Sequence, residues 1–181
     1  MDIAQWLFEN VTQNGEAMAW FGRSAEGTVI DGREAETAER RITKAYRELL
    51  SGYETDPGTV LKTTRLLEPD ERPGLVSVEH INFFSICAHH FLPFFGQVSI
   101  TYRPGDRILG LGKFPRLVQA YSRRFQIQED LVRDLALEVM RSGRAQGVRV
   151  TSEARHLCMC SRGPSDHTVM TRTEYTAGRL E

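Results

Sequence analysis

The sequence contains few cysteines and no long apolar run. Three cysteines among 181 residues cannot all pair, and a disulfide-stabilised scaffold would carry many more, so we expect a reducing compartment. The first residues lack a basic stretch followed by an apolar core, which argues against a secretory signal. No apolar run approaches the length of a membrane span. These absences predict a cytoplasmic protein that does not bind membranes.

A dominant charge of either sign is also absent. The chain has 23 basic and 24 acidic residues, a net charge of −1, and it therefore lacks the global basic field that attracts nucleic acids. We expect no nucleic-acid partner. What the chain does contain is 40% hydrophobic and 26% charged residues, which is typical of a soluble globular protein. Its length suits one domain with a real core.

Hydrophobic periodicity indicates helices and strands in a defined order. Helical spacing recurs over residues 2–13, 35–50, 113–125 and 128–141, and strand-like patterns cover residues 75–86, 94–102, 148–159 and 168–175. The glycine-rich segment before the second helix shows no clear period, so we expect a loop over residues 16–33. Strands, then a helix pair, then further strands predict an α+β domain with an antiparallel sheet.

The scarce cysteines are gathered with histidines into two short clusters. Residues 87–90 are Cys-Ala-His-His and residues 156–160 are His-Leu-Cys-Met-Cys, which together hold all three cysteines and three of the five histidines. Thiolate and imidazole are the ligands that zinc prefers. Cys87 and His90 can turn toward one point from a tight bend. On a strand, the histidine and both cysteines of the second cluster would project from one face. The two clusters therefore predict a metal site.

Two metal arrangements fit this pattern. A closed, structural site would use four ligands: Cys87, His90, Cys158 and Cys160. Without Cys160, the other three would leave a coordination position for water, which is typical of catalytic zinc. His89 and His156 would then remain beside the metal as proton-transfer groups. The alternative without a metal is three buried cysteines and histidines that bond elsewhere, since free cysteine is commonly buried.

A glycine-containing turn at residues 110–116 runs into a predicted helix start. A helix N-terminus presents free N–H groups and the positive end of its dipole, and Lys113 and Arg116 add two cations there. These features suit a phosphate, although a solvated helix start has the same pattern.

Glu129 opens the next predicted helix. It either stabilises that helix start or accepts from the N–H groups of a guanine edge, a paired contact that discriminates bases by roughly 1–3 kcal/mol.

Four segments, in the right order, resemble GTP cyclohydrolase I, and the resemblance extends over residues 36–176. They are the zinc knuckle at 85–93, the phosphate turn at 110–116, the base-recognition segment at 126–129, and the second metal segment at 153–159 with Arg162-Gly163. We identify residues 34–181 as a catalytic domain of this type. Residues 1–33 precede it as a helix and loop that do not resemble the family.

The resemblance implies a tunnelling fold, in which antiparallel strands and paired helices of several subunits join into a β-barrel. It implies a homo-oligomer, a decamer of two pentamers, with active sites at subunit interfaces. The implied partner is GTP or a related purine nucleotide. The implied reaction opens the imidazole ring of GTP at C8, releases formate and ends in 7,8-dihydroneopterin triphosphate, as in pterin and tetrahydrofolate biosynthesis.

The resemblance also implies a role for each matched residue. Cys87, His90 and Cys158 would bind zinc, although Fe2+ or another divalent ion suits the same ligands. His156 would protonate the ring nitrogen, and His89 would assist proton transfer. The residues implied in substrate binding are Glu129 and Gln128 at the guanine edge, and Lys113, Arg116, Arg162, Lys44 and Arg41 at the triphosphate.

The sequence departs from the family at several positions. Cys160 stands where the family has no ligand, which favours the open metal site. Ala88 replaces the usual Glu, and Gly112 replaces a Ser whose hydroxyl lies near the ribose and phosphate. Two further hypotheses therefore stay open. One is a related purine-nucleotide cyclohydrolase of a specialised pathway, which uses a different nucleotide or stops at an opened-ring formamidopyrimidine. The other is a non-catalytic nucleotide-binding protein with a structural zinc.

Overall fold

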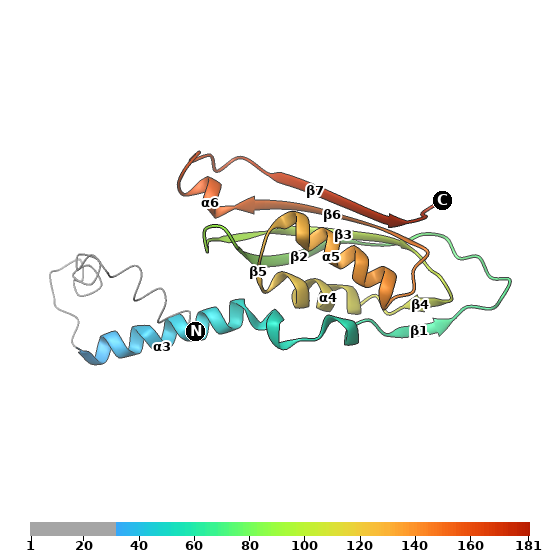
Figure 1. Cartoon of the computed structure of the whole chain (residues 1–181), viewed down its shortest axis with the longest axis horizontal. Helices are drawn as coiled ribbons and strands as arrows, with labels where there is room; N and C mark the ends of the chain where they lie inside the picture. Colours follow the sequence, from blue (N-terminus) through green and yellow to red (C-terminus); the bar gives the residue numbers. More distant parts are fainter. Residues whose placement is uncertain (1–31) are drawn as a thin grey trace. The chain divides into compact units, whose positions relative to one another are not determined.

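The computed structural model describes residues 32–181. The helix expected over residues 2–13 and most of the loop expected over residues 16–33 lie outside the described residues. The chain divides into two compact units, residues 1–48 and 49–181, which we describe separately. Helix α3 (Gly32–Leu49) belongs almost wholly to the first unit (Figure 1). It begins three residues before the predicted start and ends within a residue of the predicted end.

A five-stranded sheet forms the centre of the second unit, in the order β5–β2–β3–β6–β7 (Figure 1). Its strands are β2 (Val76–Cys87), β3 (Pro93–Arg103), β5 (Phe125–Gln126), β6 (Gly147–His156) and β7 (Thr171–Gly178). All neighbouring pairs are antiparallel except β2 and β5, which are parallel. A separate two-stranded ribbon joins β1 (Thr63–Leu66) to β4 (Arg107–Leu109). The predicted α+β class is confirmed.

Two helices cover one face of this sheet and close the core. Helix α4 (Lys113–Ser122) contacts β2, and helix α5 (Gln128–Arg141) contacts β6 and β7. Alternate strand residues such as Phe83, Val98 and Val150 point inward because successive side chains of a strand face opposite sides. They meet Leu117 and Leu135 of the helices, and none of these five side chains is more than 6% exposed. Burial of each one stabilises the fold by about 1.5–3 kcal/mol.

One predicted boundary is wrong at the end of the sheet that carries the cysteines. The strand expected over residues 148–159 ends at His156, which pairs with Phe94 of β3. Its partner strand begins at Pro93, and proline has no N–H with which to extend the ladder. The chain instead forms a helical turn, α6 (Leu157–Cys160). The second cluster therefore does not lie on one strand face, as the sequence pattern suggested.

The helix expected over residues 113–125 is also shorter than predicted. It ends at Ser122, and Phe125 already pairs with β2 as part of β5. The following helix begins at Gln128, as predicted. The return of the chain through β5 places the first turn of α5 at the same end of the sheet as the end of β2.

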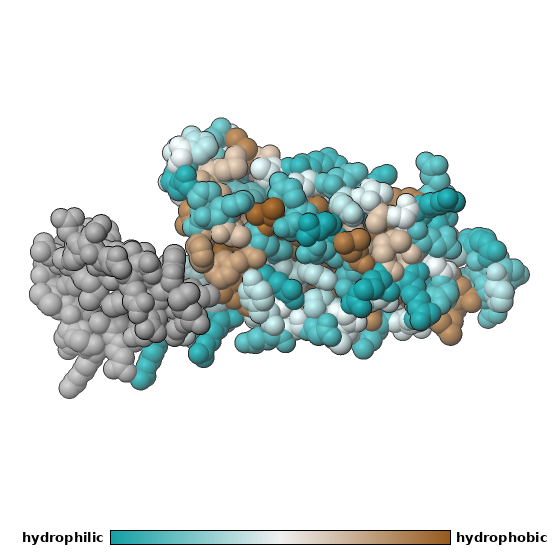
Figure 2. Space-filling view, in the orientation of Figure 1, coloured by the Kyte–Doolittle hydropathy of each residue, from teal (hydrophilic) through white to brown (hydrophobic). Residues whose placement is uncertain are grey.

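Within residues 32–181, no helix is both long and apolar enough to cross a bilayer. The face shown in Figure 2 is mostly hydrophilic, and its hydrophobic residues lie in small, separate areas.

Candidate active site

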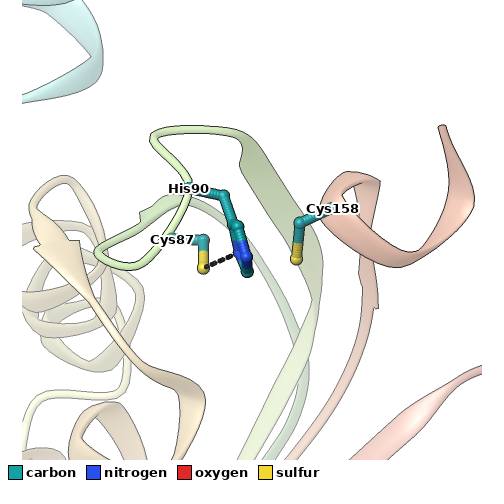
Figure 3. Close-up of side chains that lie close together, drawn as sticks. All are labelled: Cys87, His90 and Cys158. Carbon is teal, nitrogen blue, oxygen red and sulfur yellow. Dashed lines mark hydrogen bonds between the residues drawn. The ribbon is translucent and has the colours of Figure 1, made fainter. Parts of the chain in front are cut away.

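Cys87, His90 and Cys158 come together at one end of the sheet (Figure 3). Their ligand atoms all lie within 4.8 Å of one another, and Cys87 Sγ is 3.7 Å from His90 Nδ1. The two cysteines are 4% and 8% exposed, whereas His90 is exposed. The group is therefore anchored in the core and open to solvent on the histidine side.

A tight turn at the end of β2 brings Cys87 and His90 together. The N–H of Phe91 donates to the carbonyl of Cys87 at 2.9 Å. Phe91 adopts a φ of 57°, which is uncommon for a residue with a side chain, and its ring packs against Phe125 of β5 with 4.8 Å between centroids. Cys158 approaches from α6, directly after β6 ends. The ends of two strands thus supply the three candidate ligands.

The donor geometry fits a tetrahedral divalent ion. Sulfur at about 2.3 Å and nitrogen at about 2.0–2.1 Å from zinc lie roughly 3.5–3.6 Å apart at tetrahedral angles, and the 3.7 Å between Cys87 Sγ and His90 Nδ1 is close to this spacing. Burial raises the pKa of the Cys158 thiol, and the neighbouring thiol of Cys87 raises that pKa further. A cation between the sulfurs would favour both thiolates. Cys160 lies outside this group.

His156, the last residue of β6, lies half-buried where the strand meets α5. Its ring stacks on Phe94, with 4.5 Å between centroids and 5° between planes. Its Nε2 is 2.9 Å from Oε1 of Gln128. Burial lowers the pKa of His156, and the negative charge of Glu129 partly opposes that shift. Phe94 therefore fixes the plane of the imidazole ring, and Gln128 contacts one of its two nitrogens, Nε2.

Gln128 links the start of α5 to two strands. Its side chain is 2% exposed, and its amide nitrogen donates to the carbonyl of Ser152 at 3.1 Å and to that of Thr171 at 3.2 Å. Sequence reasoning missed both of these contacts. The available signal was a polar residue at an inward strand position, since Ser152 stands between buried Val150 and Ala154.

His89, Glu129 and Arg162 are exposed around the same end of the sheet. Nδ1 of His89 is 3.9 Å from the thiol of Cys87. Glu129 lies in the first turn of α5, close enough to affect the imidazole described above. Arg162 follows α6, and its charge opposes the rise in the pKa of Cys158. The structure therefore gathers these sequence-predicted residues around the candidate metal group.

Lys113 and Arg116 lie toward the opposite end of the sheet. Helix α4 begins at Lys113, just after the β1–β4 ribbon, and runs back toward β5, which pairs with the Cys87 end of β2 (Figure 1). Ten residues of helix span about 15 Å. Both cations line a cavity of about 680 Å³, together with Lys62 and Arg123. Sequence reasoning missed Lys62, which stands outside any recognisable motif.

Arg41 and Lys44 are the remaining residues predicted to bind the triphosphate. Both lie on α3, with exposed side chains. They are three positions apart, so they share one side of the helix. Their role in binding stays a prediction.

The chain matches proteins of a known family along most of its length. The family model described as GTP cyclohydrolase I matches residues 24–181. The GTP cyclohydrolase 1 of Campylobacter lari is 42% identical over 138 residues, which cover 76% of this chain and 72% of that relative. The GTP cyclohydrolase 1 of Parabacteroides distasonis is 40% identical over 138 residues, covering 76% of this chain and 70% of that relative.

Among solved structures, the apo form of the archaeosine synthase QueF-Like is similar over 61% of this chain and 100% of its own length, with 22% identity and a TM-score of 0.49. The family match and the sequence relatives are much stronger, and residues 24–181 include all the candidate site residues described above. The chain is therefore an enzyme, a hydrolase that belongs to the GTP cyclohydrolase I family.

Proposed function

We propose that this protein hydrolyses the imidazole ring of GTP at C8, releases formate and forms 7,8-dihydroneopterin triphosphate, with zinc as its metal. The observation that carries the proposal is the convergence of Cys87, His90 and Cys158, with ligand atoms within 4.8 Å of one another. His156 and Glu129 lie at the same end of the sheet. The names of the relatives, GTP cyclohydrolase 1, support GTP as the substrate.

Each residue around the metal group has a distinct task in this proposal. When bound, zinc supplies Lewis acidity and a water of lowered pKa at its open position, and Fe2+ or another divalent ion would suit the same ligands. His156 delivers a proton to the imidazole nitrogen of the substrate as the ring opens, and His89 assists. Glu129 accepts from the ring N–H and the exocyclic amine of guanine. That contact would orient C8 toward the two histidines.

The location of Lys113 and Arg116 supports an active site shared between copies of the chain. In one chain they lie about a helix length from the metal group, whereas Arg162 lies beside it. A nucleotide held by Arg162 and the metal group would therefore meet the cationic cavity of a second copy. This supports a homo-oligomer, in the family form a decamer of two pentamers. Arg41 and Lys44 would complete the triphosphate contacts.

Gly112 favours a second candidate function. An added Cβ there would meet no atom within 4 Å, and the φ of −66° suits any residue, so the usual serine would fit. The missing hydroxyl removes a contact near the ribose and phosphate and leaves the ring-opening residues in place. The second candidate is therefore a related cyclohydrolase of a specialised pathway. It acts on another purine nucleotide or stops at an opened-ring formamidopyrimidine.

Mass spectrometry of all products, after zinc-loaded protein is incubated with GTP, tests these proposals. Formate together with 7,8-dihydroneopterin triphosphate supports the first candidate. Formate with a formamidopyrimidine and no pterin supports the second, and Gly112→Ser should then increase pterin formation. Failure to release formate from any purine nucleotide would reject both, and would favour a binding protein with a structural zinc.

A further inference from the structure

The side chain of Gln128 has no hydrogen-bonding capacity left for a substrate. Its amide nitrogen donates to two backbone carbonyls, those of Ser152 and Thr171, at 3.1 and 3.2 Å. Its amide oxygen accepts from the hydroxyl of Thr171 at 2.6 Å and lies 2.9 Å from Nε2 of His156. A glutamine amide offers two donor hydrogens and two acceptor positions. All four are engaged within the chain, in a side chain that is only 2% exposed.

The two backbone carbonyls determine which way this amide points. A carbonyl oxygen accepts hydrogen bonds and cannot donate them, so the nitrogen of Gln128 must face Ser152 and Thr171. The reverse orientation would bring the amide oxygen against two carbonyl oxygens. Buried polar groups left without hydrogen-bond partners in this way destabilise the fold. The oxygen of Gln128 therefore faces His156.

An amide oxygen opposite Nε2 determines where the imidazole carries its proton. The oxygen has only lone pairs to offer, so the 2.9 Å contact is a hydrogen bond when Nε2 of His156 donates. A neutral imidazole has one donor nitrogen and one acceptor nitrogen. Nδ1 is then the acceptor. The parallel ring of Phe94, 4.5 Å away, holds the imidazole in the plane that this hydrogen bond requires.

We propose that Gln128, supported by Thr171, is a positioning residue that holds His156 as the Nε2–H tautomer and leaves Nδ1 to exchange a proton with the substrate. The inference rests on the proposed role of His156 as proton donor. In that step the Nδ1–H bond of the imidazolium breaks, and the proton moves to the imidazole nitrogen of the nucleotide. The electron pair stays on Nδ1 of the neutral ring. Glu129, and not the Gln128 side chain, then holds the guanine edge.

Three substitutions in the full, zinc-loaded chain separate positioning from base recognition. Gln128→Met removes every hydrogen bond of this amide at a similar side-chain volume. Thr171→Val removes only one hydroxyl donor. Gln97→Met is the matched control, because the amide oxygen of Gln97 also lies 3.0 Å from a histidine nitrogen, Nδ1 of His80, and neither residue belongs to a matched segment. Thermal unfolding and native mass show that each variant is folded before the comparison is made.

Solid-state 15N NMR of histidine-labelled protein measures the tautomer directly. The chain has five histidines, and a difference spectrum against His156→Gln assigns the ring of interest. We expect the Nε2–H tautomer of His156 in wild type, Thr171→Val and Gln97→Met, and its loss in Gln128→Met. An Nδ1–H tautomer in wild type, or an unchanged spectrum in Gln128→Met, overturns the proposal. This measurement needs no turnover, so it decides the positioning role even if the protein does not hydrolyse GTP.

Steady-state kinetics with GTP provides the second measurement. Gln128→Met is expected to lower kcat by about 10- to 100-fold, as is typical when the partner of a functional histidine is lost, with KM changed by less than about threefold. Thr171→Val is expected to have a smaller effect, and Gln97→Met to keep kcat within about twofold of wild type. A raised KM with unchanged kcat in Gln128→Met, or an altered preference between GTP and ATP, would assign Gln128 to the base and overturn the proposal.

Discussion

Cys158 and Cys160 are two residues apart in the chain, yet their surroundings differ. Cys158 is 8% exposed and has two other soft ligands within 4.8 Å, whereas Cys160 lies outside that group. The helical turn α6 causes the difference, because on a strand both side chains would face the same side. The proposed metal site therefore depends on one of the two cysteines.

Replacing these cysteines one at a time tests the three-ligand site. Cys158→Ser is expected to lower zinc affinity by more than about 100-fold, because the loss of even an outer-shell partner of a zinc ligand costs about 10- to 100-fold. Cys160→Ser is the matched control and should keep the wild-type zinc content after dialysis. Inductively coupled plasma mass spectrometry measures both. A comparable loss of zinc in the two variants would contradict three ligands and favour the closed four-ligand site.

The sequence allowed the grouping of Cys87, His90 and Cys158 to be predicted, but not the contacts of Gln128. The Cys-Ala-His-His cluster is a local pattern, and its geometry follows from one turn. The Gln128 amide instead contacts Ser152 and Thr171, which are 24 and 43 residues away. These contacts exist only after β6 and β7 have paired beside α5. Sequence alone could therefore suggest a base-recognition role for this side chain but not the positioning role that we propose.

Among the helices and strands, long elements with a clear hydrophobic period were predicted from the sequence, and the shortest elements were not. Helix α5 has 14 residues, almost four turns of an apolar pattern, and both of its ends were predicted. The elements that were missed, β1, β5 and α6, have four, two and four residues. A segment of two to four residues is too short to show a hydrophobic periodicity. The end of β6 depends on Pro93 in the neighbouring strand, which no local pattern reveals.

Two leucines of α5 test the packing that holds the start of this helix against the sheet. Leu135 is fully buried, and Leu137 is 46% exposed. Leu135→Ala is expected to lower the free energy of unfolding by about 2–5 kcal/mol, since it leaves a cavity in the core. Leu137→Ala should change it by less than about 0.5 kcal/mol. Urea denaturation measures both, and equal losses would contradict the assigned face of α5.

The ion pair between Arg65 and Glu71 predicts a pH dependence of stability. Arg65 Nη1 is 2.8 Å from Glu71 Oε2, and this hydrogen bond holds the pKa of Glu71 at about 2, below its usual 4.5. A carboxyl whose pKa is lower in the folded than in the unfolded protein stabilises the fold at pH values above its unfolded pKa. That stabilisation is lost as the pH falls through the pKa of the folded state. The loss here spans the interval from about 4.5 to about 2.

Glu71→Gln should therefore lower stability at pH 7 and have less effect at pH 2. The change is expected to be small, because the pair is exposed and water screens it. Urea denaturation of wild type and variant at both pH values measures the difference. The same loss of stability at pH 2 as at pH 7 would show that the ionised carboxylate does not cause it.

Across the whole chain, the two cations at the start of α4 lie apart from the metal group. Lys113 and Arg116 line one part of a cavity that extends along the helix to Arg123, whereas the metal group is at the ends of β2 and β6. Sequence motifs predicted that both would serve one substrate, but no motif reveals which copy of the chain supplies each part. The site that we propose to be shared between two copies would account for both positions.

Complementation between inactive variants tests this shared site. Lys113→Ala and Cys158→Ser are each expected to lose GTP hydrolysis, and their co-expression should restore part of it, because some sites receive both intact halves. Cys158→Ser with His156→Ala is the control pair and should recover nothing, since both changes affect the same half. Formate release by co-purified assemblies measures recovery. Equal inactivity of the two mixtures would contradict a site built from two chains.

Formate release from GTP, compared between wild type and Cys158→Ser after zinc loading, tests whether ring hydrolysis depends on the proposed metal site. We predict that wild type releases formate in an amount equal to the GTP consumed. We predict that Cys158→Ser releases it at least about 100-fold more slowly, because the metal-assisted step is lost. Intact GTP after incubation with zinc-loaded wild type, or equal rates for the two proteins, would contradict metal-dependent ring hydrolysis at Cys87, His90 and Cys158.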